Sequence, residues 1–287
     1  MTSPAEHTVL HLYGVVGETP PMSLPTGVGG APVEVVEVAG LSVLGSELDV
    51  ERYGPRVWQE KGQDPAWLTQ VATEHHAVLQ AVVEQGDVLP LRLPSLYLDR
   101  AAADRALSGE AESLRSALEA LRGHVEVAVK VYLSEGTAEG TAEGAPEGNA
   151  ADASDAADGQ SAPLRGRDYL ARRASEKTRK EEARERRHQA VLDLHEALAD
   201  GSTHAVVSPA QDPSLSGRAE PMLLNAAYLV PRDQLEGFHG LTERAAECVA
   251  KQSLVVELSG PWPPYSFTSM GRPRQGEQQR EQEQEQE

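Results

Sequence analysis

Two periods of hydrophobic residues alternate along this chain, and their order constrains the fold more than any other feature. Segments 8–16 and 124–133 show the β-branched and alternating patterns of strands, whereas 65–83 repeats apolar residues at the helical period behind Asp64, a helix N-cap. With the weaker elements, the order is strands, helix, strand, helix, strand, then helix, strand, strand, helix, strand. Because this order lacks the regular alternation of a doubly wound sheet, it predicts an α+β fold with two ferredoxin-like (split βαβ) domains.

The weaker elements follow from turn residues and short apolar runs. Segment 33–48 predicts a hairpin broken at Ala39-Gly40, and 88–93 predicts a short strand that Pro90 places at an edge. A second helical region, 107–121, is interrupted near Ser108-Gly109. In the second half we expect a long charged helix from Leu164 to about Asp200, strands at 204–208, 222–230 and 253–259, and a helix over 231–252.

Composition divides the chain into four parts. Residues 134–163 carry seven acidic residues, no basic residue and no apolar period, so they predict a disordered acidic insert that cannot offset its chain entropy. The Gln/Glu-rich residues 271–287 predict a disordered tail. We therefore expect an N-terminal α+β domain over 1–133 and a C-terminal α+β domain, with the long charged helix, over 164–270.

Charge and hydropathy exclude several classes of protein. The net charge of -19 argues against a nucleic-acid partner, because phosphates are bound by basic surfaces. The sequence has no apolar run near the length that spans a membrane, about 20 residues. Its first residues lack the basic and apolar regions of a signal peptide, so we expect a cytoplasmic protein.

The residue types of catalytic and metal sites form no recognisable pattern. Cys248 is the single cysteine and lies in a helical pattern, so we expect a buried structural thiol. His75 and His76 are adjacent, diverge by about 100° on a helix and cannot share a metal ion. His75 lies on the apolar stripe and is expected to be a buried, neutral, hydrogen-bonded imidazole. We expect no enzymatic activity, no cofactor and no metal.

Aromatic residues are scarce, yet three of them fall in the octet GPWPPYSF, residues 260–267. Trp262, Tyr265 and Phe267 are interleaved with prolines there. In one interpretation the rings fold back as a lid over a sheet, and the prolines end the pairing of the preceding strand. In the other, the rings are presented to a partner as rigid anchors. The residues alone leave both interpretations open.

Six stretches, in this order, resemble the gas vesicle protein F/L family (GvpF/GvpL). Together they span almost the whole chain outside the acidic insert and the tail, and SGPWPPYSF after a strand is the most specific of them. The stretches are LYGVV (12–16), HHAVLQAVVEQGDVLPLRL (75–93), VEVAVKVYL (125–133), GRDYLARR (166–173), AYLVPR (227–232) and SGPWPPYSF (259–267).

The resemblance implies a non-enzymatic, cytoplasmic accessory protein for gas vesicle assembly, built from two α+β domains. Such a protein binds the small hydrophobic shell subunit (GvpA-like) and keeps it soluble or nucleates its polymerisation, and other gas vesicle accessory proteins are further candidate partners. The alternative is a minor structural component retained in the mature gas vesicle. Candidate partner-binding residues lie in two of the matching stretches: Trp262, Pro263, Pro264, Tyr265, Phe267 and Arg92.

Overall fold

The computed structural model describes residues 8–17, 23–134, 162–212 and 217–270. The expected acidic insert and Gln/Glu tail therefore lie outside the described residues, apart from the two ends of the insert. One of those ends differs from the expectation, because Ala162 and Pro163 already belong to the long helix.

The first half is built on an antiparallel sheet with the order β2-β3-β1-β4, to which a short strand, β5, adds by pairing with β1. The expected hairpin is confirmed: Val38 pairs with Leu41, and both turn residues, Ala39 (φ 51°) and Gly40 (φ 69°), have the positive φ of a two-residue hairpin turn. The expected edge position of Pro90 is also confirmed, in a strand shorter than predicted. The strands are β1 (Thr8–Val16), β2 (Glu34–Val38), β3 (Leu41–Asp49), β4 (Val88–Pro90) and β5 (Leu96–Tyr97).

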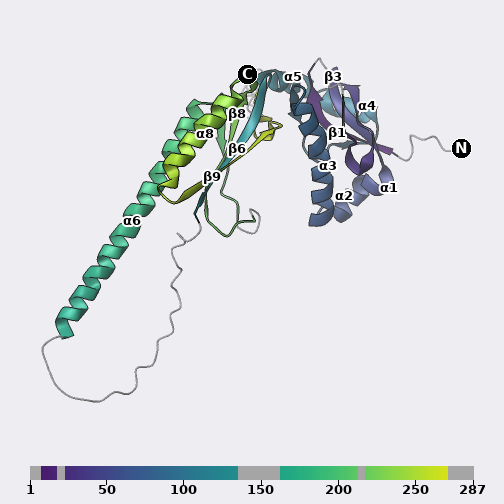
Figure 1. Cartoon of the computed structure of the whole chain (residues 1–287). Helices are drawn as coiled ribbons and strands as arrows, with labels where there is room; N and C mark the ends of the chain where they lie inside the picture. Colours follow the sequence, from purple (N-terminus) through teal and green to yellow (C-terminus); the bar gives the residue numbers. More distant parts are fainter. Residues whose placement is uncertain (1–7, 18–22, 135–161, 213–216, 271–287) are drawn as a thin grey trace, which may run out of the picture.

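Helices cover both faces of this sheet, which explains why β1 is buried along nearly its whole length (Figure 1). Val9 and Tyr13 of β1 pack with α3, whereas Leu10 and Leu12 pack with α4 and α5. Asp64 caps α3 as expected and accepts a hydrogen bond from the Ala66 N–H at 2.9 Å. The helices are α1 (Val50–Tyr53), α2 (Pro55–Lys61), α3 (Pro65–Val83), α4 (Arg100–Leu107) and α5 (Ala111–Ala120), with a short 3₁₀ turn η2 (Val28–Gly30).

The second half is a four-stranded antiparallel sheet with the order β7-β8-β6-β9. Helices α6 and α8 pack on one of its faces, and the N-terminal part of α6 extends far beyond the sheet (Figure 1). The long charged helix is thus confirmed. The elements are β6 (His124–Leu133), α6 (Ala162–Asp200), β7 (His204–Val207), β8 (Met222–Pro231), η3 (Arg232–Gln234), α8 (Leu235–Ala250), β9 (Leu254–Trp262) and η4 (Tyr265–Phe267).

Two features differ from the sequence expectations. The sequence predicts that strand β6 belongs to the domain 1–133, but β6 is a central strand of the second sheet. The boundary between the residues of the two sheets therefore lies before His124. The limits of independently folding domains stay a prediction. Cys248 is exposed rather than buried, because the neighbouring Val249 takes the inward position of α8 and turns Cys248 outward.

The two halves meet at the face of the second sheet that α6 and α8 leave uncovered. Ala227 and Leu229 of β8 pack there with α5 and with Phe267. The Arg232 guanidinium closes the C-terminal end of α3 by donating to the carbonyl oxygens of Val83 (2.5 Å) and Gly86 (2.6 Å). An apolar contact and a helix cap therefore hold the halves together.

Candidate functional site

The octet GPWPPYSF (260–267) begins inside the last strand rather than after it. β9 continues through Pro261 to Trp262, which pairs with Glu126 of β6 after a register shift at Gly260 (φ 127°). The interpretation that the prolines end strand pairing is therefore wrong for Pro261, because the irregular step at Gly260 lets the strand resume contact beyond it, whereas β9 does end directly before Pro263 and Pro264. Only after Trp262 does the chain leave the sheet and form η4.

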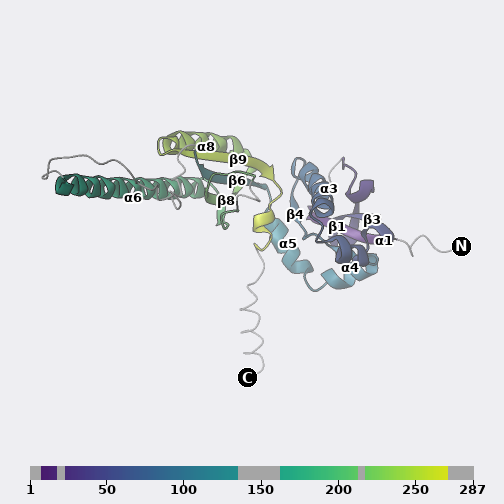
Figure 2. The same cartoon turned by 90° about the horizontal axis from the view of Figure 1, so that it is seen from below.

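The three rings of the octet have different surroundings. Phe267 is 1% exposed and belongs to the apolar core between α5 and the two sheets, so it is a core residue rather than an exposed contact. Figure 2 shows this C-terminal segment beside α5. Tyr265 is 39% exposed and its hydroxyl lies 2.9 Å from Nδ1 of His76. Trp262 is half-buried, with its ring centroid 5.4 Å from that of His76.

Side chains from both halves fix the octet in place. Glu126, 7% exposed, accepts hydrogen bonds from the Ser266 N–H (2.7 Å) and the Ser266 hydroxyl (2.9 Å). Burial raises the pKa of Glu126, and the two bonds from Ser266 oppose that shift. From α3, the Gln80 amide donates to the Pro261 carbonyl at 3.0 Å. The octet is thus held on one side by β6 and on the other by α3.

A pocket of about 470 Å³ opens between α3, the segment after β4 and the octet. We call it the junction pocket. It brings together two of the predicted site residues, Arg92 and Tyr265, from positions far apart in the sequence. Arg92 is exposed, and the buried Pro263 and Pro264 are not among the lining residues. The lining residues are Ala72, His75, His76, Pro90, Leu91, Arg92, Leu93, Tyr265 and Thr268.

The wall of the junction pocket at His75 leads into a buried imidazole pair. Nδ1 of His75 and Nε2 of His11 are 3.0 Å apart, and Tyr13 stacks on His75 at 5.1 Å between ring centroids. Burial, with a smaller effect of His76, lowers the pKa of His75 to about 4. Burial, with a smaller effect of His75, lowers the pKa of His11 to about 3. The expectation of a buried, neutral, hydrogen-bonded His75 is confirmed.

The chemistry of the junction pocket favours binding. Its lining offers a guanidinium and a partly exposed phenol, which are side-chain types enriched at protein interfaces, beside the apolar side chains of Leu91 and Leu93. The lining contains no carboxylate or cysteine thiol, and Nδ1 of His75 is already bonded within the protein. In the described part of the chain, no group of three or more His, Cys, Asp or Glu residues could hold a metal ion.

Three residues that position this site were not predicted from the sequence: His76, Gln80 and Glu126. The position of His76 could have been predicted from its adjacency to the inward-facing His75. Successive residues of a helix are rotated by about 100°, so His76 lies at the side of α3. For Glu126, the alternating pattern of residues 124–133 predicts a polar face exposed to water. Its burial depends on the octet, which lies about 140 residues further along.

Together, fold and site define a two-sheet α+β protein with a pocket between α3, the segment after β4 and the octet. None of its described helices has the length and apolar character needed to cross a membrane. The family model for gas vesicle synthesis protein GvpL/GvpF matches residues 9–269. The chain therefore belongs to the GvpL/GvpF family, as the six stretches indicated, and membership implies a role in gas vesicle formation.

Individual relatives and solved structures agree with this assignment. Gas vesicle protein L of a Streptomyces species is 32% identical over 244 residues, which cover 85% of this chain and 86% of the relative. Gas vesicle protein F of Haloferax mediterranei is 23% identical, with 91% and 93% covered. The crystal structure of GvpF from an Anabaena species shares the fold, with a TM-score of 0.62, 17% identity, and 91% of this chain and 96% of that chain covered.

Proposed function

We propose that this protein is a cytoplasmic accessory factor of gas vesicle assembly that binds the small hydrophobic shell subunit (GvpA-like). Binding keeps the subunit soluble or nucleates its polymerisation. The observation that carries the proposal is the family match over residues 9–269. It is supported by the character of the junction pocket, which combines anchoring side chains with a fixed backbone.

The charge of the chain suits this task. A subunit that polymerises through apolar surface must be kept from aggregating, and a net charge of -19 makes complexes with this protein repel one another. The junction pocket supplies the contact: Tyr265 is held by His76, so it loses little conformational freedom on binding, and Arg92 is exposed at the other side. Trp262 lies beside this pair and extends the contact surface.

We also infer that both halves are ferredoxin-like units. The second half has the chain order β6-α6-β7-β8-α8-β9 and the sheet order β7-β8-β6-β9, as a split βαβ unit requires. The first half has the equivalent sheet order β2-β3-β1-β4, but among the described residues between β1 and β2 the only helical element is the short turn η2.

Co-expression with the shell subunit tests the proposed binding. The tagged chain is expected to co-purify with the shell subunit, and Tyr265→Ala to lose it. Tyr169→Ala is the matched control, because Tyr169 is a second exposed tyrosine (55%) on the projecting part of α6. Failure of the wild-type chain to co-purify, with normal vesicles formed in its absence, would contradict the proposal.

The alternative role, a minor component of the finished vesicle, is distinguished by washing. Purified vesicles are treated with urea and probed for the chain. A transient assembly factor is absent from the washed particle, whereas a structural component remains.

A further inference from the structure

Strand β2 is an edge of the first sheet, and its outer side has no strand partner among the described residues. The pairing of Val38 with Leu41 closes the two-residue hairpin, so this pair is hydrogen-bonded. Hydrogen-bonded and non-hydrogen-bonded pairs alternate along an antiparallel ladder. The N–H and C=O groups of Val35 and Glu37 therefore point away from β3, toward the outer side.

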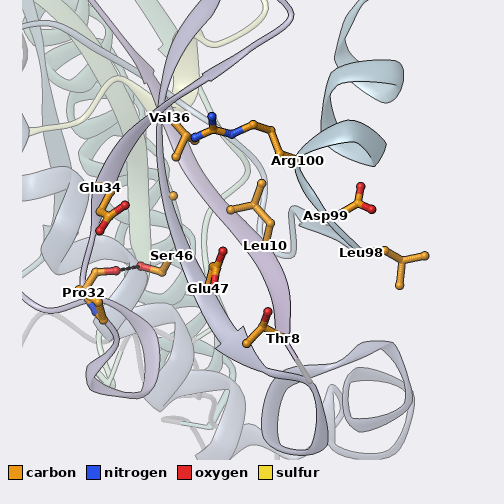
Figure 3. Close-up of a pocket in the computed structure, with 11 residues that line it drawn as sticks. Thr8, Leu10, Pro32, Glu34, Val36, Ser46, Glu47, Leu98, Asp99 and Arg100 are labelled. Carbon is orange, nitrogen blue, oxygen red and sulfur yellow. Dashed lines mark hydrogen bonds between the residues drawn. The ribbon is translucent and has the colours of Figure 1, made fainter. Parts of the chain in front are cut away.

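A pocket of about 350 Å³ opens on the sheet face beside this edge (Figure 3). Its apolar floor includes the buried side chains of Leu10 and Val36. A Cβ atom built on Gly45 would lie 3.2 Å from Leu12 Cδ2 and 3.3 Å from both Leu10 Cδ1 and Val36 Cγ2, closer than ordinary van der Waals contact, so these side chains pack directly on the Gly45 backbone. The lining residues are Thr8, Leu10, Pro32, Glu34, Val36, Gly45, Ser46, Glu47, Leu98, Asp99 and Arg100.

The rim of this pocket is acidic. The carboxylates of Glu34 and Glu47 are exposed and form no hydrogen bond or ion pair with any residue that the structure describes. Asp99 is already engaged, because it accepts from the Ala102 N–H at 2.6 Å at the start of α4. Arg100 is the one basic residue of the lining, and its guanidinium lies near Val36 (Figure 3). The rim therefore retains two free carboxylates above an apolar floor.

We infer that β2 is a docking edge for an extended segment of a partner protein with lysine or arginine at alternate positions. The segment adds as a further strand and pairs with the outward N–H and C=O groups of Val35 and Glu37. A basic side chain on the pocket face lies beside Leu10, with its aliphatic stem on the apolar floor and its cation at Glu34 and Glu47, away from the Arg100 guanidinium at Val36.

Two observations favour this partner over a helix or an acidic peptide. A row of unpaired backbone groups is satisfied by another extended backbone, which a helix cannot offer because its own groups are bonded internally. The two free carboxylates repel an acidic side chain at the same position. The inference goes beyond the proposed function, since it does not require the partner to be the shell subunit.

A fluorescent seven-residue peptide of alternating valine and lysine, titrated against the full chain by anisotropy, tests the inference. Val35→Pro removes an outward N–H but no bond to β3, so the protein stays folded, with a melting temperature within about 3 °C of wild type. We expect at least tenfold weaker binding for this variant. The charge reversal Glu34→Lys should weaken binding similarly.

Glu60→Lys is the matched control, because it makes the same charge change at an exposed residue of α2 that does not line the pocket. It should leave the affinity within about twofold of wild type. The inference is overturned by absence of binding up to about 1 mM peptide. It is also overturned by unchanged binding to a folded Val35→Pro protein, by equal weakening in Glu60→Lys and Glu34→Lys, or by equal binding of an alternating valine and glutamate peptide.

Discussion

Lowering the pH should destabilise this protein through the buried His11–His75 pair. Burial lowers the pKa of His11 to about 3 and that of His75 to about 4, whereas an unfolded histidine titrates near 6.5. Below pH 6.5 the unfolded chain therefore binds two protons that the folded chain does not. Stability is complete above pH 6.5 and falls as the pH drops toward 4.

The magnitude follows from the pKa differences. Each histidine removes about 1.4 kcal/mol of unfolding free energy per pH unit below 6.5. At pH 5 the loss is about 2 kcal/mol per histidine, or about 4 kcal/mol for the pair, which is a large part of the stability of a typical domain. Burial also lowers the pKa of His76, which adds to the loss, and the raised pKa of Glu126 opposes it at lower pH, but both groups are present in every variant compared.

Urea denaturation between pH 8 and 5 measures this loss, with His11→Gln as the comparison. The variant is expected to be less stable at every pH, but its stability should fall with pH about half as steeply as that of the wild type. The slope of unfolding free energy against pH reports proton linkage, whereas the general cost of the substitution lowers the free energy at every pH. A wild-type stability that is flat from pH 8 to 5, or an unchanged slope in His11→Gln, would refute the reasoning.

Three further substitutions test how the halves and the helices are held. Arg232→Gln removes the donor to the carbonyls of Val83 and Gly86 and should cost about 3 kcal/mol in urea denaturation; a loss below about 0.5 kcal/mol would show that water replaces it fully. Phe267→Ala should cost about 4 kcal/mol by the same assay, and a negligible loss would contradict its place in the core. Asp64→Ala should cost about 1 kcal/mol through the lost cap of α3, and no change in thermal unfolding would argue against that cap.

Features set by local sequence were predictable. The hairpin at Ala39-Gly40 follows from turn residues that accept positive φ, and the start of α3 follows from an Asp-Pro pair that caps and preorganises a helix. The burial of His75 follows from its position on the apolar stripe. In each case the determining residues lie within a few positions of one another.

Features set by distant pairing were not predictable. β6 alternates as cleanly as any strand of the first sheet, and only its partners, β8 and β9, place it in the second. The same holds for the junction pocket, where Tyr265 meets His76 across 189 positions of sequence. The sequence singled out the aromatic octet, but which of its rings faces inward depends on α5 and β6, and sequence periodicity carries no information on that contact.

The solubility of the shell subunit tests the central claim most directly. The subunit is synthesised in a cell-free system with or without this chain, and the fraction remaining in the supernatant after ultracentrifugation is measured. We predict a larger soluble fraction with the wild-type chain and with Tyr169→Ala, but not with Tyr265→Ala. An equal soluble fraction with and without the wild-type chain, with no faster assembly of vesicle-like particles, would contradict the account.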